Sequence, residues 1–166
     1  MRNWLLFFLC IFPVATYANV VWPALELESR LLSWWPICVG LIVEFFFVRR
    51  LLCTSTRKAI EATVAANIVS AVLGIVLIPI GGFVWEILVG VILYKALGIG
   101  TFNPITWTAT FLIACAVNVL IEGVVYRRVF KLNFKIKSHI FLWFMLANSI
   151  SVGIAMFSLY INPIEY

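Results

Sequence analysis

The sequence contains no Asp, a single His and few charges of either sign. Only 11% of the 166 residues are charged, whereas 64% are hydrophobic. Soluble domains are nearer one quarter charged and one half apolar, so one soluble core could not bury this much apolar surface. These shortages exclude a soluble enzyme and a disordered chain, and they predict a protein embedded in a lipid bilayer.

Side chains that commonly carry metal, redox or acid–base chemistry are also scarce. The four Cys residues, Cys10, Cys38, Cys53 and Cys115, are scattered without a CxxC motif, and His139 lies beside a basic loop. This spacing predicts neither a metal site nor a disulfide framework. Neither His nor Asp is placed to activate a serine nucleophile. We therefore expect no catalytic residue, no cofactor and a protein that is not an enzyme.

The charge that is present is mostly positive, with 12 Lys and Arg residues against 7 acidic residues. The cations gather at the ends of apolar runs, a pattern typical of membrane orientation rather than of nucleic-acid binding. Nine of them form two basic loops, which contain Arg49, Arg50, Arg57, Lys58, Arg127, Arg128, Lys131, Lys135 and Lys137. The pattern predicts a multi-pass protein of a bacterial-type cytoplasmic (inner) membrane, with both basic loops in the cytoplasm and no nucleic-acid partner.

The first 18 residues have the composition of a secretory signal peptide. Arg2 precedes an apolar run over 4–14, and Thr16 and Ala18 form a small-x-small cleavage site. An uncleaved first anchor is the alternative, and in both cases residue 19 starts on the outer side. We predict a signal peptide over 1–18 and a single membrane domain over 19–166.

Four apolar runs approach the roughly 20 residues that a helix needs to cross a bilayer. They cover 34–48, 59–78, 105–126 and 140–161. The second run is expected to end at Pro79, Gly81 and Gly82. If the next segment, 83–98, were a fifth span, the cations of 127–137 would face outward, against the positive-inside rule. We therefore expect 83–98, like 19–33, to lie on the outer surface or, as the alternative for 83–98, to re-enter the membrane.

Two halves of the chain share a sequence pattern. Residues 39–51 read VGLIVEFFFVRRL and residues 117–129 read VNVLIEGVVYRRV, so a Glu precedes an Arg-Arg pair by the same spacing in both. The motif Ala-Asn-x-x-Ser then recurs from Ala66 and from Ala147, within stripes of small residues spaced four apart. The predicted fold class is therefore an all-α integral membrane protein with four transmembrane helices as two parallel helix-pair repeats, 19–82 and 83–166, plus outer-side interfacial or re-entrant helices. Chance combined with the positive-inside rule is the alternative explanation.

Glu44 and Glu122 are the foremost candidates for a site inside the membrane. At ~1.5 Å per residue, each lies about 7–9 Å from the neighbouring arginine pair, and intramembrane acids usually face a partner or a cavity. One interpretation is a proton- or cation-linked site. The other is a structural ion pair with the arginines of the other repeat: Arg127 or Arg128 for Glu44, and Arg49 or Arg50 for Glu122.

Further polar residues continue from these acids. Asn67 and Asn148 lie in the small-residue stripes, and Asn118 lies one turn before Glu122. They are interpreted either as hydrogen-bonding residues between closely packed helices or as the polar lining of a narrow path. Glu86 is a candidate outer-segment site if 83–98 re-enters the membrane.

Two functional hypotheses follow from these patterns. The first is a non-enzymatic accessory or scaffold subunit of a larger membrane assembly, held there by its small-residue stripes. The second is a subunit of a small transporter or channel that uses Glu44 and Glu122. The expected partners are the lipid bilayer and either another membrane protein or a second copy of the chain.

Overall fold

The computed structural model describes residues 22–161, and the predicted signal peptide over 1–18 lies outside them. Within this range the chain forms helices joined by loops, without strands, which confirms the all-helical fold class. The helices are α2 (Trp22–Leu31), α3 (Trp34–Leu51), α4 (Thr56–Trp85), the π-helical turn η2 (Glu86–Gly90), α5 (Val91–Leu97), α6 (Pro104–Arg128) and α7 (His139–Ile161).

Three helical segments are long and apolar enough to cross a membrane. They are Thr56–Leu97, Pro104–Arg128 and His139–Ile161. A fourth would consist of α2 and α3 together, which are bent by 74° at their short break. Their length and composition indicate a membrane protein.

Local sequence signals set several helix ends. Asn103 caps α6, because its side-chain oxygen accepts hydrogen bonds from the backbone N–H groups of Ile105 and Thr106 at 2.8 and 3.0 Å. Pro104 occupies the first turn, where its missing N–H costs nothing. Gly98 ends α5 with φ of 65°, a left-handed conformation that glycine adopts without a steric penalty.

The expected break at Pro79 is wrong, because α4 continues through it and η2 and α5 prolong the run to Leu97. A proline inside a helix removes one backbone donor, and neighbouring helices make this tolerable in an apolar setting. The nearby glycines serve helix contacts instead of ending the helix. A Cβ on Gly81 would lie 2.6 Å from Ile113, and one on Gly82 would lie 2.9 Å from Ala24. Close packing against α6 and α2 therefore explains both glycines.

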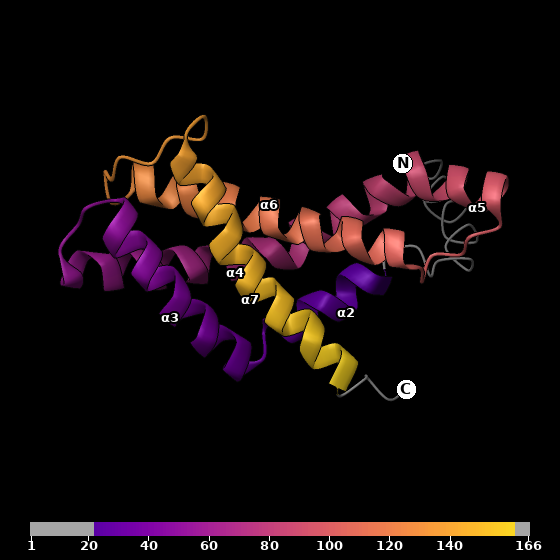
Figure 1. The fold of residues 1–166 in the computed structure, drawn as a ribbon, viewed down its shortest axis with the longest axis horizontal. Helices are drawn as coiled ribbons and strands as arrows, with labels where there is room; N and C mark the ends of the chain where they lie inside the picture. Colours follow the sequence, from indigo (N-terminus) through magenta and orange to yellow (C-terminus); the bar gives the residue numbers. More distant parts are fainter. Residues whose placement is uncertain (1–21, 162–166) are drawn as a thin grey trace, which may run out of the picture.

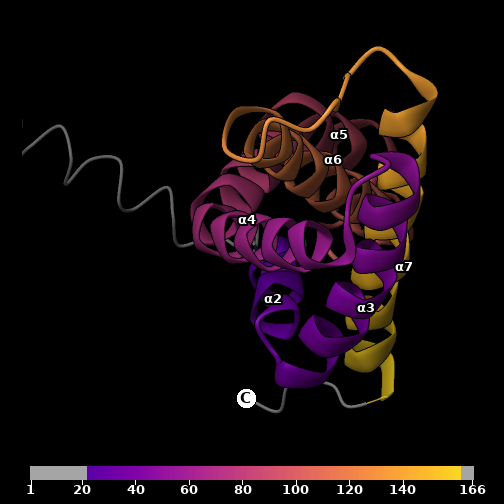
Figure 2. The same cartoon turned by 90° about the vertical axis from the view of Figure 1, so that its left-hand side faces the viewer.

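The helices pack as two crossing pairs. α4 lies along α6 and α3 lies along α7, and the second pair crosses the first (Figures 1 and 2). α2 packs into the angle between the pairs, against α4 and α7. Its Leu27 is fully buried there, next to Ile78 and Val152. The predicted short helix near the start is therefore present, and one face of it belongs to the core.

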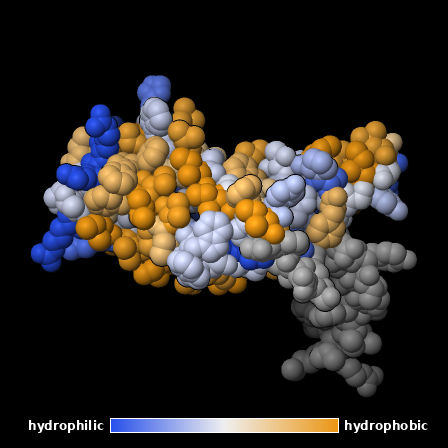
Figure 3. All heavy atoms as spheres, turned by 60° about the horizontal axis from the view of Figure 1, so that its bottom comes forward, coloured by the Kyte–Doolittle hydropathy of each residue, from blue (hydrophilic) through white to orange (hydrophobic). Residues whose placement is uncertain are grey.

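The surface of the molecule is apolar along its length and basic at one end. Large exposed side chains include Ile42, Phe46, Ile68 and Val72. In Figure 3 hydrophobic residues dominate the middle of the visible face, and the hydrophilic residues gather at the left-hand end, where Figure 1 places the loops after α3 and α6. An apolar belt of this kind is a surface that lipid solvates better than water.

The loop between α6 and α7 packs back against these two helices. Phe134 is buried beside Tyr126 and Phe144, with ring centroids 6.1 and 5.4 Å away. Its ring fits because residue 123 is glycine: a Cβ there would lie 2.3 Å from the Phe134 ring. This contact fixes the basic loop to the end of α6.

We therefore expect Gly123→Ala to lower the thermal stability of the purified protein. The added methyl overlaps the Phe134 ring, and overpacking of this kind costs about 1–3 kcal/mol. Gly153→Ala is the matched control, since a Cβ there would meet Phe111 at an ordinary 3.9 Å. Unfolding in mild detergent measures both variants, and equal melting temperatures would contradict the packing role of Gly123.

Candidate functional site

Glu44 and Glu122 lie inside the helix crossing. Glu44 comes from α3 and Glu122 from α6, and each side chain is only 1% exposed. Such burial removes a carboxylate from water and requires hydrogen-bond donors around it. The structure thus places both sequence candidates in the interior of the bundle.

Four side chains from α4 and α7 supply the donors. Asn67 donates to Glu44 through its Nδ2, and Ser151 donates through Oγ at 3.5 Å. Around Glu122, Asn148 donates from Nδ2 at 3.0 Å and Ser70 from Oγ at 3.4 Å. Each glutamate therefore receives one Asn from the helix that follows it in the chain and one Ser from the more distant helix.

The two asparagines are held by their own helices. Asn67 Nδ2 also donates to the backbone oxygen of Thr63 at 3.0 Å, and Asn148 Nδ2 donates to that of Phe144 at 3.3 Å. These second hydrogen bonds fix the orientation of each amide group independently of its bond to the carboxylate. Donors fixed in this way hold the two carboxyl groups in place without supplying a positive charge.

The expected ion pairs with arginine do not form. Among the residues that the structure describes, no salt bridge joins Glu44 or Glu122 to the arginine pairs. The side chains of Arg49, Arg50, Arg127 and Arg128 are exposed at the basic end of the bundle. Long arginine side chains reach water from a helix end, whereas the glutamates face inward and find Asn and Ser closer.

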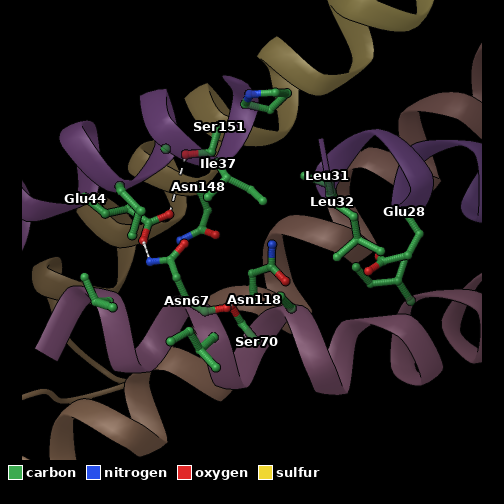
Figure 4. Close-up of a pocket in the computed structure, with 17 residues that line it drawn as sticks. Glu28, Leu31, Leu32, Ile37, Glu44, Asn67, Ser70, Asn118, Asn148 and Ser151 are labelled. Carbon is green, nitrogen blue, oxygen red and sulfur yellow. Dashed lines mark hydrogen bonds between the residues drawn. The ribbon is translucent and has the colours of Figure 1, made fainter. Parts of the chain in front are cut away.

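A cavity of about 170 Å³ adjoins this network. It lies among α2, α3, α4, α6 and α7, and its polar lining residues are Glu28, Glu44, Asn67, Ser70, Asn118, Asn148 and Ser151. Figure 4 shows Glu44 with Asn67 and Ser151 on one side of the cavity and Glu28 on the other. The polar network is therefore next to a space that can hold a small ligand.

The structure brings together most of the sequence candidates. Asn118 lies across from α3 in the cavity wall, together with the asparagines that bond the glutamates. Glu122 does not line the cavity and is connected to it through Asn148 and Ser70. The candidate polar site is thus one cluster rather than two separate sites.

Glu86 is not part of this cluster. It is buried in the π-helical turn η2, where it accepts a hydrogen bond from Thr101 Oγ1 at 3.1 Å. Its carboxyl group occupies space above Gly90, since a Cβ there would lie 2.3 Å from it. In this structure Glu86 packs the turn between α5 and α6.

Sequence reasoning missed three residues of the site. Ser70 and Ser151 were interpreted only as small stripe residues, although both follow an Asn by three positions in the matched Ala-Asn-x-x-Ser motif. That spacing puts both polar groups on one helix face and was the available signal. Glu28 was assigned to a surface helix, and its burial depends on how α2 docks against α4.

The small-residue stripes face inward. Ala62, Ala66, Ser70 and Gly74 of α4 are buried, as are Ala147, Ser151 and Ala155 of α7. Small residues allow helices to approach closely. Here they bring the four long helices of this chain together, so the stripes do not form an outer surface for another protein.

Within residues 22–161, no group of three or more His, Cys, Asp or Glu side chains is placed to hold a metal ion. Comparisons with protein-family models, with curated proteins and with solved structures give no match to this chain. Its function must therefore be inferred from the glutamates, their donors and the cavity.

We expect Asn148→Ala to destabilise the folded protein by about 1–3 kcal/mol, because a buried Glu122 oxygen would lose its donor. Ser149→Ala is the neighbouring control: Ser149 donates to the backbone of its own helix, at Met145, and contacts Cys115 at 3.8 Å. Equilibrium unfolding in detergent compares the two variants. An equal loss of stability in both would show that the Glu122 hydrogen bond contributes little.

Proposed function

We propose that this protein is a transporter or channel subunit of a bacterial-type inner membrane that moves a proton or a small cation through Glu44 and Glu122. The observation that carries the proposal is that both carboxyl groups are buried in one polar cluster, with Glu44 in the wall of a cavity and Glu122 behind it, and have amide and hydroxyl partners instead of arginines.

The energetics of burial favour a cation-binding role. A buried ion without an opposite charge costs several kcal/mol, and intramembrane acids usually mark ion or proton pathways. Asn and Ser donors reduce this cost but leave the negative charge uncompensated. A bound proton or cation neutralises the charge, and its departure restores the costly state, so the site is suited to reversible binding.

The hydrogen bonds also support the proposal that the chain is built of two parallel helix-pair repeats. Glu44 and Glu122 occupy matched positions in the sequence, and so do Asn67 and Asn148. Each Glu bonds the Asn of its own pair and the Ser of the other. An axis along the membrane normal would exchange the two halves and place the paired glutamates on either side of it.

The accessory-subunit hypothesis has less support. It depended on small-residue stripes that hold a partner protein, and those stripes are used inside the bundle. The exposed surface offers large apolar side chains that lipid can cover. Purification as a stable complex with a different membrane protein would support the accessory role instead.

The transport proposal predicts that Glu44→Gln combined with Glu122→Gln abolishes cation movement. Gln keeps the volume, its Oε1 can accept the Asn hydrogen bond and its Nε2 can donate to the Ser hydroxyl, but it does not carry the negative charge that binds a proton or a cation. Purified protein in liposomes is assayed for proton flux with an internal pH dye and for uptake of Na⁺ and Rb⁺.

We expect wild-type flux above that of empty vesicles and double-variant flux equal to it. Glu61→Gln is the control, because Glu61 is exposed and pairs with Arg57 on the surface at 2.9 Å. If the double variant folds and conducts as well as the wild type, the glutamates have a structural role.

The proposed topology places both basic loops in the cytoplasm and the α5–α6 connection outside. The helical run Thr56–Leu97 has 42 residues, about 63 Å at 1.5 Å per residue, whereas a bilayer core is ~30 Å thick. We therefore propose that its last turns, up to α5, extend beyond the membrane on the outer side.

Fusions at Gly100 and at Asn133 test this orientation. We expect an alkaline phosphatase to be active at Gly100 and inactive at Asn133, and a fluorescent protein to give the opposite result, because cations are retained in the cytoplasm. Fluorescence at Gly100 would overturn the four-span arrangement.

A further inference from the structure

Glu28 is a buried carboxylate that the transport proposal does not use. It lies on α2 and is 6% exposed. Within residues 22–161 its Oε2 is buried without a hydrogen-bond partner. The carboxyl group lies over Gly74 of α4, where a Cβ would be 3.4 Å from Oε1. Glycine thus leaves room for a carboxyl group whose Oε2 has no donor among the described residues.

This carboxyl group borders the same cavity as Glu44, from the opposite side. Figure 4 shows the two acids separated by the cavity, with Asn118 and Asn148 between them. Of the described side chains that line the cavity, none is a Lys or Arg. The described lining of the cavity is therefore acidic without a basic residue, and one of its carboxyl groups is incompletely hydrogen-bonded.

The exposed part of the lining is apolar. Leu32, Ile37, Val64 and Ile68 are all lining residues with exposed side chains, and they come from the α2–α3 bend, α3 and α4. The polar groups of the cavity lie in its buried part, beside Pro36 and Ile78, and its mouth is aliphatic. A ligand that matches both parts carries a positive charge at one end and an apolar group at the other.

We propose that the cavity binds a small organic cation, an ammonium group with a short apolar substituent, with the charged group between Glu28 and Glu44. The inference rests on the proposed transport function and names its substrate class. The cavity is smaller than the ~300–1,000 Å³ of drug-sized sites, which limits the ligand to a compact molecule.

The shape of the site favours an organic over an inorganic cation. Hard metal cations bind six or more oxygen atoms that converge at short distance, whereas Glu28 and Glu44 lie on opposite sides of the cavity. A quaternary ammonium spreads its charge over methyl groups, so it can contact carboxylates and aliphatic walls together. Because none of the described lining residues is aromatic, the carboxylates must supply the attraction that aromatic cages supply elsewhere.

The test uses benzyltrimethylammonium as the probe and the purified full chain in nonionic detergent. We expect saturable binding of the labelled probe that neopentylbenzene, its neutral carbon isostere, does not displace. Glu28→Gln is expected to weaken binding at least about tenfold, since it removes one member of a buried charge pair. Glu61→Gln, which alters a surface acid, should bind as the wild type does.

A second variant tests the cavity without changing any charge. Val64→Trp places a bulky side chain at the apolar mouth and should weaken binding. Val72→Trp is its control, because Val72 is exposed on the same helix but does not line the cavity. Melting temperatures check that Glu28→Gln, Glu61→Gln, Val64→Trp and Val72→Trp all fold. If Glu28→Gln does not fold, the comparison of Val64→Trp with Val72→Trp decides whether the cavity is the binding site.

The outcomes separate this inference from the transport proposal. Proton or Na⁺ flux that depends on Glu44 and Glu122, without binding of benzyltrimethylammonium, overturns the organic-cation site and leaves the transport proposal standing. Displacement by neopentylbenzene, or unchanged binding in both Glu28→Gln and Val64→Trp, also overturns the site. Absence of both flux and binding overturns both proposals.

Discussion

The burial of two carboxyl groups where four helices meet is the constraint on which the rest of the structure depends. Glu44 and Glu122 each need donors, and those donors come from α4 and α7. Sliding one helix along another by a single residue would remove an Asn or a Ser from its glutamate and leave a buried oxygen unsatisfied, at a cost of about 1–3 kcal/mol. Apolar helices alone have little register preference, so these polar contacts specify how the pairs cross.

Small residues make these hydrogen bonds between helices possible. A donor as short as serine reaches a carboxylate on another helix only if the backbones come close. Gly40 makes this possible between α3 and α7, since a Cβ there would lie 3.1 Å from Ser151 Oγ. Gly74 similarly leaves space for the carboxyl group of Glu28. The small-residue stripes and the buried acids therefore depend on each other. Because small and polar residues occupy the helix contacts, the large apolar side chains remain on the outside.

Much of this arrangement was predictable from the sequence, because periodicity and charge act locally. The apolar runs located the long helices, and the matched Glu and Asn positions located the polar cluster. The partners of the glutamates were not predictable by charge, because Arg49 and Arg127 can extend into water from a helix end while Ser151 cannot. The continuation through Pro79 and the burial of Glu28 depend on contacts between α2, α4 and α6, which no local pattern records.

The distribution of charge along the molecule also bears on how a cation would reach the site. Most of the exposed basic residues gather at the end where the loops after α3 and α6 lie, whereas Lys95 lies on α5, and α2, with Arg30 as its single basic residue, lies away from that end (Figure 1). Positive charges repel an approaching cation, and such fields act over about 8–10 Å at physiological ionic strength. A cation that approaches on the α2 side therefore meets less repulsion, and Glu28 is the first acid on that side of the cavity. On the proposed orientation this side faces outward, so Glu28 would receive the cation before Glu44, whose carboxyl group would keep its hydrogen bonds from Asn67 and Ser151 until the cation arrives.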